Sequence, residues 1–574
     1  MTRGQGLTAA IALAAAILLL GRATALLFVN REWYATLGAS SVWRDRVATT
    51  AVMYGVAFVL GLAFAWANVA AVRRSVIALV VPKRLGNVEF GEEVSSHRLW
   101  AVTIGVSAAA AALSLLVLPQ WTVPAIARSR VVFAETDPYF GLDLSHFVAW
   151  LPLEEAMYHW CVALFAIVAI LVVVMYSLTP SLRWTRGAIR IAAYARRHIS
   201  VLGAILLLLA AWGFRLDAFT TLIDGSGAGG TLTRIDRVWI IPADVALSLV
   251  AIGASVVLLA AGWVGQTITA FATVTIIVAA TLATQLLAPI AAAQIAASPA
   301  SAAAEAPYAE TRADYTARAF PPPGRLASLQ YAADSTLLSH AAAVAIPGAL
   351  PEIVYPNAIG TAVVRDPGRI MVAPRMGDGV RRLLRAWAEQ NPRMLTGDLP
   401  SNAAFVRERD VRDRVRSLAP IFAQSRPIGA IPTANGVLWI VDLFVMSETY
   451  PLAAARIVAG ERITYWRHAG TAYVSGGTGA AVIVPDSAPD PVARAWFAAH
   501  PGGYIAPTVP PAMLEGPHVP AVPVPPPMTP AGDTAFRHAV EHAYSRMRAA
   551  LDSGNLRAFG IAFDSLGIAV RGHP

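Results

Sequence analysis

The sequence is poor in charge and in cysteine. Of its 574 residues only 14% are charged, while 56% are hydrophobic. A soluble domain is nearer one quarter charged, so a large apolar segment must be present. The one cysteine, Cys161, excludes disulfides within the chain, zinc ribbons and CxxC redox chemistry.

The chain also has a single lysine, which excludes a nucleotide-binding loop. Lys83 is followed by Arg84, whereas a Walker A loop needs Gly-Lys-Ser or Gly-Lys-Thr. ATP-driven transport would therefore require a separate ATPase. Residues 1–290 carry 20 basic side chains against 14 acids, and residues 291–574 carry 25 against 22. Neither half is basic enough to predict nucleic-acid binding.

Long apolar runs fill the first half of the chain. A bilayer core needs about 20 consecutive apolar residues in a helix. Such runs predict seven spans, near residues 7–29, 47–70, 99–121, 157–178, 199–216, 243–264 and 267–290. Backbone polar groups cannot stay unpaired in lipid, so the runs must be helical. Residues 1–290 are therefore predicted to form a membrane α-helical bundle of about seven transmembrane helices, with the lipid bilayer as its first partner.

The first run also has the features of a cleavable signal peptide. Arg3, the apolar stretch Leu7–Leu20 and the triplet Ala23-Thr24-Ala25 match the three parts of such a signal. Because the apolar run continues to Val29, we expect it to be retained as an anchor. Cleavage stays open as the alternative.

Basic residues in the loops predict the orientation. The 71–98 and 179–198 loops carry five basic residues each, and the loops on the opposite side carry fewer bases and more acids. We therefore expect a multi-pass protein of the cell (plasma or inner) membrane with a cytoplasmic N-terminus and extracytoplasmic residues 291–574. The connection at 264–267 is uncharged. If residues 243–290 were one re-entrant element, the large region would lie on the other side.

The second half is predicted to be a mixed α/β extracytoplasmic domain with flanking segments. A linker rich in Ala, Ser and Pro at 291–323 leads into the α/β domain at 324–505. Ten prolines at 506–530 predict an extended strap, and 531–574 a C-terminal helix pair near 532–552 and 555–570. Within the domain, helices are expected at 378–391, 402–418 and 491–500, and strands at 436–445 and 462–484.

Several segments together carry a family resemblance. They read "WYATLG" from Trp33, "DPYFGLDLSHF" from Asp137, "EAPYAETRADY" from Glu305, "RDVRDRVRSLAP" from Arg409, "GVLWIVDLFVMSETYP" from Gly436 and "LDSGNLRAFG" from Leu551. In order and spacing they resemble UPF family 0182, an uncharacterised family of large prokaryotic multi-pass membrane proteins. The resemblance implies fold and topology, and no activity. Family members are usually longer, and the region between Phe320 and Val380 looks shortened here.

Acids and imidazoles of one external loop form the main candidate site. They are Asp137, Asp143, His146, Glu154, Glu155 and His159. The i,i+4 spacing of Glu155 and His159 places both on one helix face. Such groups could mark a proton or cation route, or hold Ca²⁺ or Mg²⁺. The alternative is a set of interfacial polar residues that cap the fourth helix. Within the spans, Gln285 and Arg22 are the clear polar candidates.

Three further patterns are weighed against ordinary structure. His538-Ala539-Val540-Glu541-His542 matches the inverted zinc-protease pattern, but no Glu follows to complete a ligand set, so we interpret 538–542 as a chance match on a solvated helix. The Arg-rich helix at 402–418 is expected to be exposed and salt-bridged, with anion binding as the alternative. Asp442 is expected to be a buried, hydrogen-bonded structural acid, with a catalytic role as the alternative.

Two functions remain after these exclusions. The first is a non-enzymatic cell-envelope protein, in which the bundle anchors an extracytoplasmic domain that binds an envelope polymer, a lipid or another membrane protein. The second is an ion or solute transporter or channel with an extracytoplasmic gating domain. The first is favoured because half of the mass lies outside the bundle and the spans carry few charges. No catalytic residue, metal or cofactor is assigned, and the ligand and the oligomeric state do not follow from the sequence.

Overall fold

The structure is a computed structural model that describes most of the chain. The described residues are 3–77, 84–85, 88–89, 96–177, 182–185, 188–227, 229–284, 290, 299–320, 352–368, 371–433, 435–458, 460–514, 533–552, 558–559, 561–563 and 565–566. They fall into two compact units, Met1–Pro517 and His518–Pro574. The first unit contains both the membrane helices and the α/β region, so these two parts form a single compact unit.

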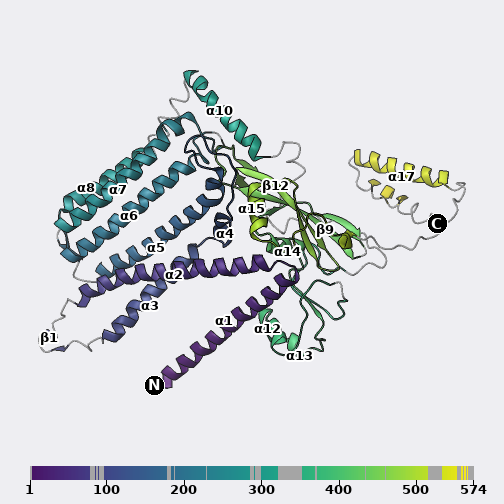
Figure 1. The fold of residues 1–574 in the computed structure, drawn as a ribbon, viewed down its shortest axis with the longest axis horizontal. Coiled ribbons are helices and arrows are strands. Elements are labelled where there is room, and N and C mark those ends of the chain that lie inside the picture. The colour runs from purple at the N-terminus through teal and green to yellow at the C-terminus, as the bar shows by residue number, and fades with distance from the viewer. Residues whose placement is uncertain are drawn as a thin grey trace. The chain divides into compact units, whose positions relative to one another are not determined.

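Six helical segments are long and apolar enough to cross a membrane (Figure 1). They cover Leu13–Thr36, Ser40–Arg73, Leu99–Val117, His146–Ser177, Ala193–Thr220 and Asp236–Val264, and they match the first six expected spans. Their helices are α1 (Arg3–Thr36), α2 (Ser40–Ile77), α3 (Ser96–Ser114) with η1 (Leu115–Val117), α5 (Leu151–Ser177), α6 (Ala193–Thr220) and α7 (Ile241–Val264). Large apolar side chains such as Ile170 and Leu249 stay exposed on them, which suits a lipid environment.

The seventh expected span, 267–290, is only partly described. Its helix α8 covers Thr267–Leu282 and has 16 residues. At 1.5 Å per residue this is about 24 Å, short of a hydrocarbon core of about 30 Å. Gln285 lies outside the described residues. The seventh span therefore stays a prediction.

The helices α5 to α8 pack as successive neighbours, and α2 packs against α3 and α5 (Figure 1). Small residues allow the closest approach. A Cβ atom on Gly262 of α7 would lie 2.0 Å from the Ser200 hydroxyl oxygen of α6. Helices in lipid associate through such close backbone packing, because apolar burial alone offers little between them. Helix α1 contacts α2 and also α12 (Val380–Ala388).

The α/β region is built on an antiparallel five-stranded sheet. Its order is β13 (Ala481–Pro485), β12 (Tyr465–Ser475), β9 (Gly436–Ser447) and β7 (Ala423–Gln424), with β8 (Gly429–Thr433) also paired to β9. The expected strand at 436–445 is confirmed as β9, and the expected run at 462–484 contains two strands, β12 and β13, joined by a turn. Shorter pairs are β5 (Ala362–Val364) with β6 (Ala404–Val406) and β10 (Arg456–Val458) with β11 (Glu461–Ile463). Two more, β1 (Arg84–Leu85) with β2 (Val88–Glu89) and β3 (Leu182–Thr185) with β4 (Ala188–Ile191), lie in the Arg-rich loops.

Short helices complete this region. They are α12, α13 (Arg393–Thr396), α14 (Val411–Leu418), α15 (Pro491–Ala499) and α16 (Pro511–Leu514), while the short helix α4 (Thr122–Arg128) belongs to the bundle side, between α3 and α5. The expected helices at 378–391 and 491–500 match α12 and α15. The one at 402–418 is wrong in its first half, where β6 precedes α14. Asp410 accepts hydrogen bonds from the backbone of Arg412 and Asp413, so the helix begins only there.

The expectation of an exposed, salt-bridged Arg-rich helix is also wrong. Arg412 and Arg414 are each 1% exposed. The Arg414 guanidinium donates to the carbonyls of Arg407, Glu408 and Gly479, at 2.8, 3.0 and 2.7 Å. These arginines therefore fasten loops from inside the fold. Of the arginines in this segment, only Arg416 forms the expected exposed pair, with Asp413 at 2.7 Å.

The flanking segments depart in part from expectation. The expected linker at 291–323 contains a 21-residue helix, α10 (Pro299–Ala319). Residues 515–532 of the expected Pro-rich strap lie outside the described residues. In the second unit, α17 (Asp533–Asp552) matches the first terminal helix and carries His538, Glu541 and His542 exposed on its surface. The second terminal helix falls mostly outside the described residues.

Candidate functional site

The α/β region is fastened to the ends of the membrane helices. At the α1–α2 turn, Gly38 has a φ of +71°, and a Cβ there would lie 2.9 Å from the Gly503 Cα, so the turn needs glycine for both reasons. One turn into α2, Asp45 pairs with the buried His500 at 3.0 Å. At the α6–α7 connection, Asp224 pairs with Arg462 at 2.9 Å. These contacts fix the α/β region to the bundle at several helix ends.

Helix α10 lies at the same junction. Glu305 accepts a hydrogen bond from the Arg234 backbone at 3.0 Å, and Tyr315 donates to the Thr136 carbonyl at 3.3 Å. Thr316 accepts one from the Ala454 backbone at 2.8 Å. The segment expected as a linker thus ties the α6–α7 connection, the 133–146 loop and the α/β region together.

Two of the six candidate residues, Asp137 and Asp143, stabilise the loop in which they lie. The buried Asp137 carboxylate accepts backbone hydrogen bonds from Tyr139, Phe140 and Leu142, at 2.6 to 2.9 Å. Burial would raise the pKa of Asp143, but hydrogen bonds from Ser145 and the Phe133 backbone outweigh it and lower that pKa below its ordinary value. The oxygens of both carboxylates therefore stabilise the turn before α5. This agrees with the alternative interpretation, in which these residues are interfacial and cap the fourth helix.

Glu154 and His146 lie beside α6. The Glu154 carboxylate is buried, pairs with Arg215 and accepts a hydrogen bond from the Trp212 indole at 3.0 Å. His146 packs edge-on against Phe219, with ring centroids 5.2 Å apart, and its Nε2 atom is buried without a hydrogen-bond partner. Glu154 is therefore neutralised within the protein, whereas His146 keeps an unused polar atom.

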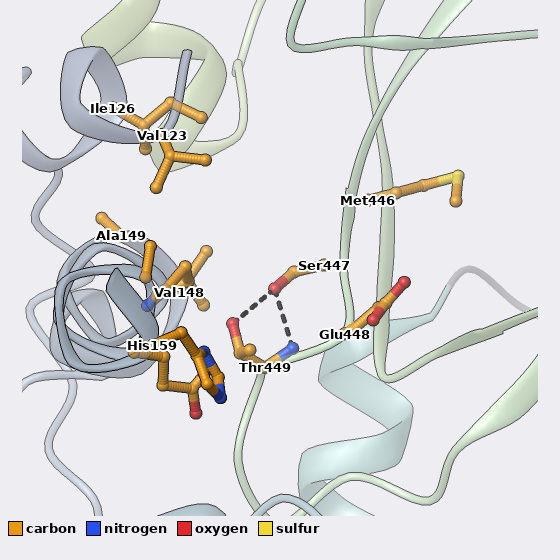
Figure 2. Close-up of a pocket in the computed structure, with 12 residues that line it drawn as sticks. Val123, Ile126, Val148, Ala149, His159, Met446, Ser447, Glu448 and Thr449 are labelled. Carbon is orange, nitrogen blue, oxygen red and sulfur yellow. Dashed lines mark hydrogen bonds between the residues drawn. The ribbon is translucent and has the colours of Figure 1, made fainter. Parts of the chain in front are cut away.

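Glu155 and His159 line a cavity of about 420 Å³ between α4, α5 and the end of β9. The wall on the bundle side is mostly apolar and is made by Val123, Ile126, Val148, Ala149, Pro152 and Ala156, with Glu155 and His159. The facing wall is Met446 to Thr449 (Figure 2). There Ser447 and Thr449 share a hydrogen bond of 3.0 Å between their hydroxyls. The cavity suits a ligand with an apolar part and a polar or cationic group.

The structure therefore brings together two of the six predicted residues, and they meet a strand more than 280 residues away. None of the described Asp, Glu, His and Cys side chains form a group of three or more placed to hold a metal ion. Sequence reasoning missed the wall from β9, because only the tertiary fold brings it to α5. It also missed Asp217 on α6 and Asp244 on α7, two acids within the spans.

A second acid–imidazole cluster lies at one end of the sheet. The His468 ring contacts Asp486 at 2.8 Å through Nδ1 and Asp442 at 3.6 Å through Nε2. Thr471 also donates to Asp442, at 3.1 Å. Asp442 is hydrogen-bonded as expected, but the expectation that it is buried is wrong, because its side chain is 34% exposed. The cluster joins β9, β12 and the segment after β13.

His468 makes the stability of this region depend on pH. Burial would lower the pKa of His468, but its contacts with Asp442 and Asp486 outweigh burial and raise it above 6.5. A raised folded-state pKa stabilises the fold fully below the unfolded pKa and loses that effect as the pH rises through the folded value. We expect thermal unfolding of the purified protein to shift to lower temperature above pH 6.5 for this reason. The His468→Gln variant should lose this part of the profile, and the exposed-site control His538→Gln should keep it.

Comparison with known proteins gives the family. The family described as "Uncharacterised protein family (UPF0182)" matches residues 7–337 and 368–514 of this chain. The chain belongs to UPF0182. This confirms the resemblance read from the sequence segments, and it adds no activity, because UPF0182 is uncharacterised.

Individual UPF0182 proteins match shorter parts. One from Synechococcus sp. (strain JA-3-3Ab) is 29% identical over 206 residues, which are 36% of this chain and 22% of that protein. One from Cupriavidus necator is 26% identical over 228 residues, 39% of this chain and 25% of that protein. One from Methanospirillum hungatei is 29% identical over 145 residues, 25% of this chain and 15% of that protein. The matches thus span a quarter or less of each relative, and no solved structure matches the chain.

Proposed function

We propose that this UPF0182 chain is a non-enzymatic cell-envelope protein. Its α/β region lies on the extracytoplasmic face, fixed on the bundle, and binds an envelope component in the cavity between α5 and β9. The observation that carries the proposal is this cavity, because its two walls come from the bundle and from the α/β region. Among its lining residues, the Ser447 and Thr449 hydroxyls pair with each other, and the apolar side chains opposite them offer a surface for the apolar part of a ligand.

The helix ends support the proposed orientation. The α/β region contacts the α1–α2 turn and the α6–α7 connection, through Asp45 and Asp224. The two loops with five basic residues each, 71–98 and 179–198, follow α2 and α5. They therefore lie at the opposite ends of the helices from these contacts. By the positive-inside rule those loops are cytoplasmic, so the α/β region is extracytoplasmic. Since α7 ends on the side of the Arg-rich loops and α10 contacts the other side, the chain must cross once more, which supports a seventh span.

A cysteine-labelling experiment tests the orientation. In a Cys161→Ala background, Ile457→Cys places a thiol at a site that is 71% exposed in the α/β region. Gln266→Cys places one at the exposed α7–α8 connection. We expect a membrane-impermeant maleimide to label position 457 in intact cells and position 266 only after permeabilisation. The reverse pattern would sink the proposed orientation.

Filling the cavity tests the proposed binding. Ala156→Trp adds a large side chain to the cavity wall, whereas Met157→Trp adds the same side chain at a neighbouring position that is 48% exposed. With native mass spectrometry of the full chain, we expect phosphatidylethanolamine to stay bound to the wild type and to Met157→Trp. Ala156→Trp should lose it. Equal lipid binding by all three proteins would remove the cavity as the binding site.

Transport remains the second candidate, and the acids within the spans favour it. Glu155 faces the cavity, while Asp217 and Asp244 lie in α6 and α7. Ionisable side chains at such positions often mark ion routes. In proteoliposomes, an ion flux that Glu155→Gln abolishes would establish transport over envelope binding. Asp143→Asn is a poor reporter, because that carboxylate holds the turn before α5.

A further inference from the structure

Helix α12 carries a continuous apolar stripe. Its members are spaced i, i+3, i+4 and i+7, so they share one face of the helix. They are Val380, Leu383, Leu384 and Trp387. In a soluble domain such a stripe faces the core, because apolar side chains are stabilised by leaving water. Val380 and Leu383 are instead 70% and 43% exposed. Half of the stripe is therefore left uncovered by the described part of the chain.

The polar side of α12 is turned toward the protein. The Arg385 side chain is 1% exposed, pairs with Glu32 of α1 and donates to the Met376 carbonyl. The Arg382 side chain is 18% exposed and donates to the Leu399 carbonyl. The usual arrangement of a surface helix, with its charged side in water and its apolar side in the core, is thus inverted. The protein satisfies the charged side, and the apolar side faces outward.

Helix α12 lies beside the membrane span of α1 (Figure 1). The Trp387 indole occupies the space that a Cβ atom on Gly21 would need, so glycine permits this close approach. Further along α1, Ala25 and Val29 are buried in one cluster with Ala386 of α12. The contact therefore covers α1 from Gly21 to Val29, within its apolar run.

The position of Gly21 along α1 gives the depth of this contact. The apolar run of α1 extends from Leu7 to Val29. A hydrocarbon core of about 30 Å takes about 20 residues of helix, so a core that begins at Leu7 ends near residue 27, and one that ends at Val29 begins near residue 9. In both placements Gly21 lies inside the core, in the half nearer the α1–α2 turn. The Trp387 ring beside it is therefore at the level of the lipid acyl chains.

We propose that α12 is an interfacial membrane helix, and that Val380, Leu383 and Trp387 insert among the acyl chains of the leaflet on the side of the α/β region. The adjoining surface of α1 is open to the same lipids, because Leu20 is 68% exposed. The exposed Arg381 borders the stripe, where its guanidinium can reach lipid phosphates while its stem stays in apolar surroundings. Interfacial helices bury their apolar face about 5–10 Å into this boundary, a depth that agrees with the contact at Gly21.

Spin labelling tests the proposal on the full chain, reconstituted in vesicles of phosphatidylethanolamine and phosphatidylglycerol. In a Cys161→Ala background, the label is attached to Leu383→Cys or to Val380→Cys. Collisions with oxygen report acyl chains, and collisions with a water-soluble nickel complex report solvent. The reference variants are Leu20→Cys on α1 and Ile457→Cys, which is 71% exposed in the α/β region. We expect oxygen-to-nickel collision ratios at 380 and 383 that match the ratio at 20 and exceed the ratio at 457 several-fold.

Two results would overturn the proposal. A ratio at either position as low as that at 457 would place the stripe in water. Protection of either label from both oxygen and nickel would mean that protein, such as a second copy of the chain, covers the stripe. Since Val380 and Leu383 are exposed, neither replacement disturbs a packed side chain, and either variant carries the test if the other fails to fold. The outcome depends neither on the orientation of the chain nor on ligand binding in the α5–β9 cavity.

Discussion

Replacing Arg414 with leucine is expected to destabilise the α/β region by about 3–5 kcal/mol. Burial lowers the pKa of Arg414 to about 10, so the guanidinium is charged at neutral pH. It is 1% exposed and donates to three backbone carbonyls. Leucine fills part of the volume but leaves those carbonyls without donors, and each unsatisfied buried group costs about 1–3 kcal/mol.

The measurement is the thermal or denaturant unfolding of the purified variant, followed by tryptophan fluorescence. The matched control is Arg416→Leu, on the same helix, because its pair with Asp413 is half-exposed on both sides. Exposed pairs contribute about 0–1 kcal/mol. Similar losses in the two variants would show that the buried hydrogen bonds of Arg414 are not what stabilises the helix.

The second large effect is expected at the contact between α1 and α12. Arg385 of α12 is 1% exposed, pairs with Glu32 of α1 and donates to the Met376 carbonyl. Glu32→Ala leaves this guanidinium buried without its counter-ion, and breaking such a pair from one side costs about 3–5 kcal/mol. We expect a loss of this size in the free energy of unfolding.

A double-mutant cycle with Arg385→Met separates the pair from the packing around it. The double variant should be less destabilised than the sum of the two single variants, because it no longer holds an unpaired buried charge. The control Asp378→Ala removes the acid of a pair whose carboxylate is 76% exposed and lies 3.5 Å from Arg382. Additive losses in the cycle would mean that Glu32 and Arg385 act independently.

The sequence predicts the helices of the bundle well, because lipid demands long apolar runs and leaves little choice of structure. It predicts the strands β9 and β12 from their apolar content for a similar reason. The start of α5 is predicted six residues late, since Glu154 and Glu155 interrupt the apolar run. The ion pair of Glu154 with Arg215 and the position of Glu155 on a cavity wall depend on the tertiary structure, which hydropathy does not contain.

The candidate site and the buried arginines show where prediction from the sequence ends. Alternating Arg and Asp along 407–416 is compatible with an exposed helix, and only the partner carbonyl of Gly479, 65 residues away, decides that Arg414 is buried. The cavity likewise needs β9 beside α5. Asp244 could have been identified from the sequence, because Pro242 and Asp244 repeat the Pro-x-acid spacing of Pro152 and Glu154.

The contact between Asp45 and His500 has a consequence for biosynthesis. The two residues are 455 positions apart in the chain. At a synthesis rate of about 5–20 residues per second, Asp45 waits roughly 25–90 s before His500 has been translated. During this time the α1–α2 hairpin must persist without the contacts that its turn later makes with the α/β region. The bundle must therefore be inserted and stable before the α/β region has been synthesised. The sheet then assembles against helices that are already in place.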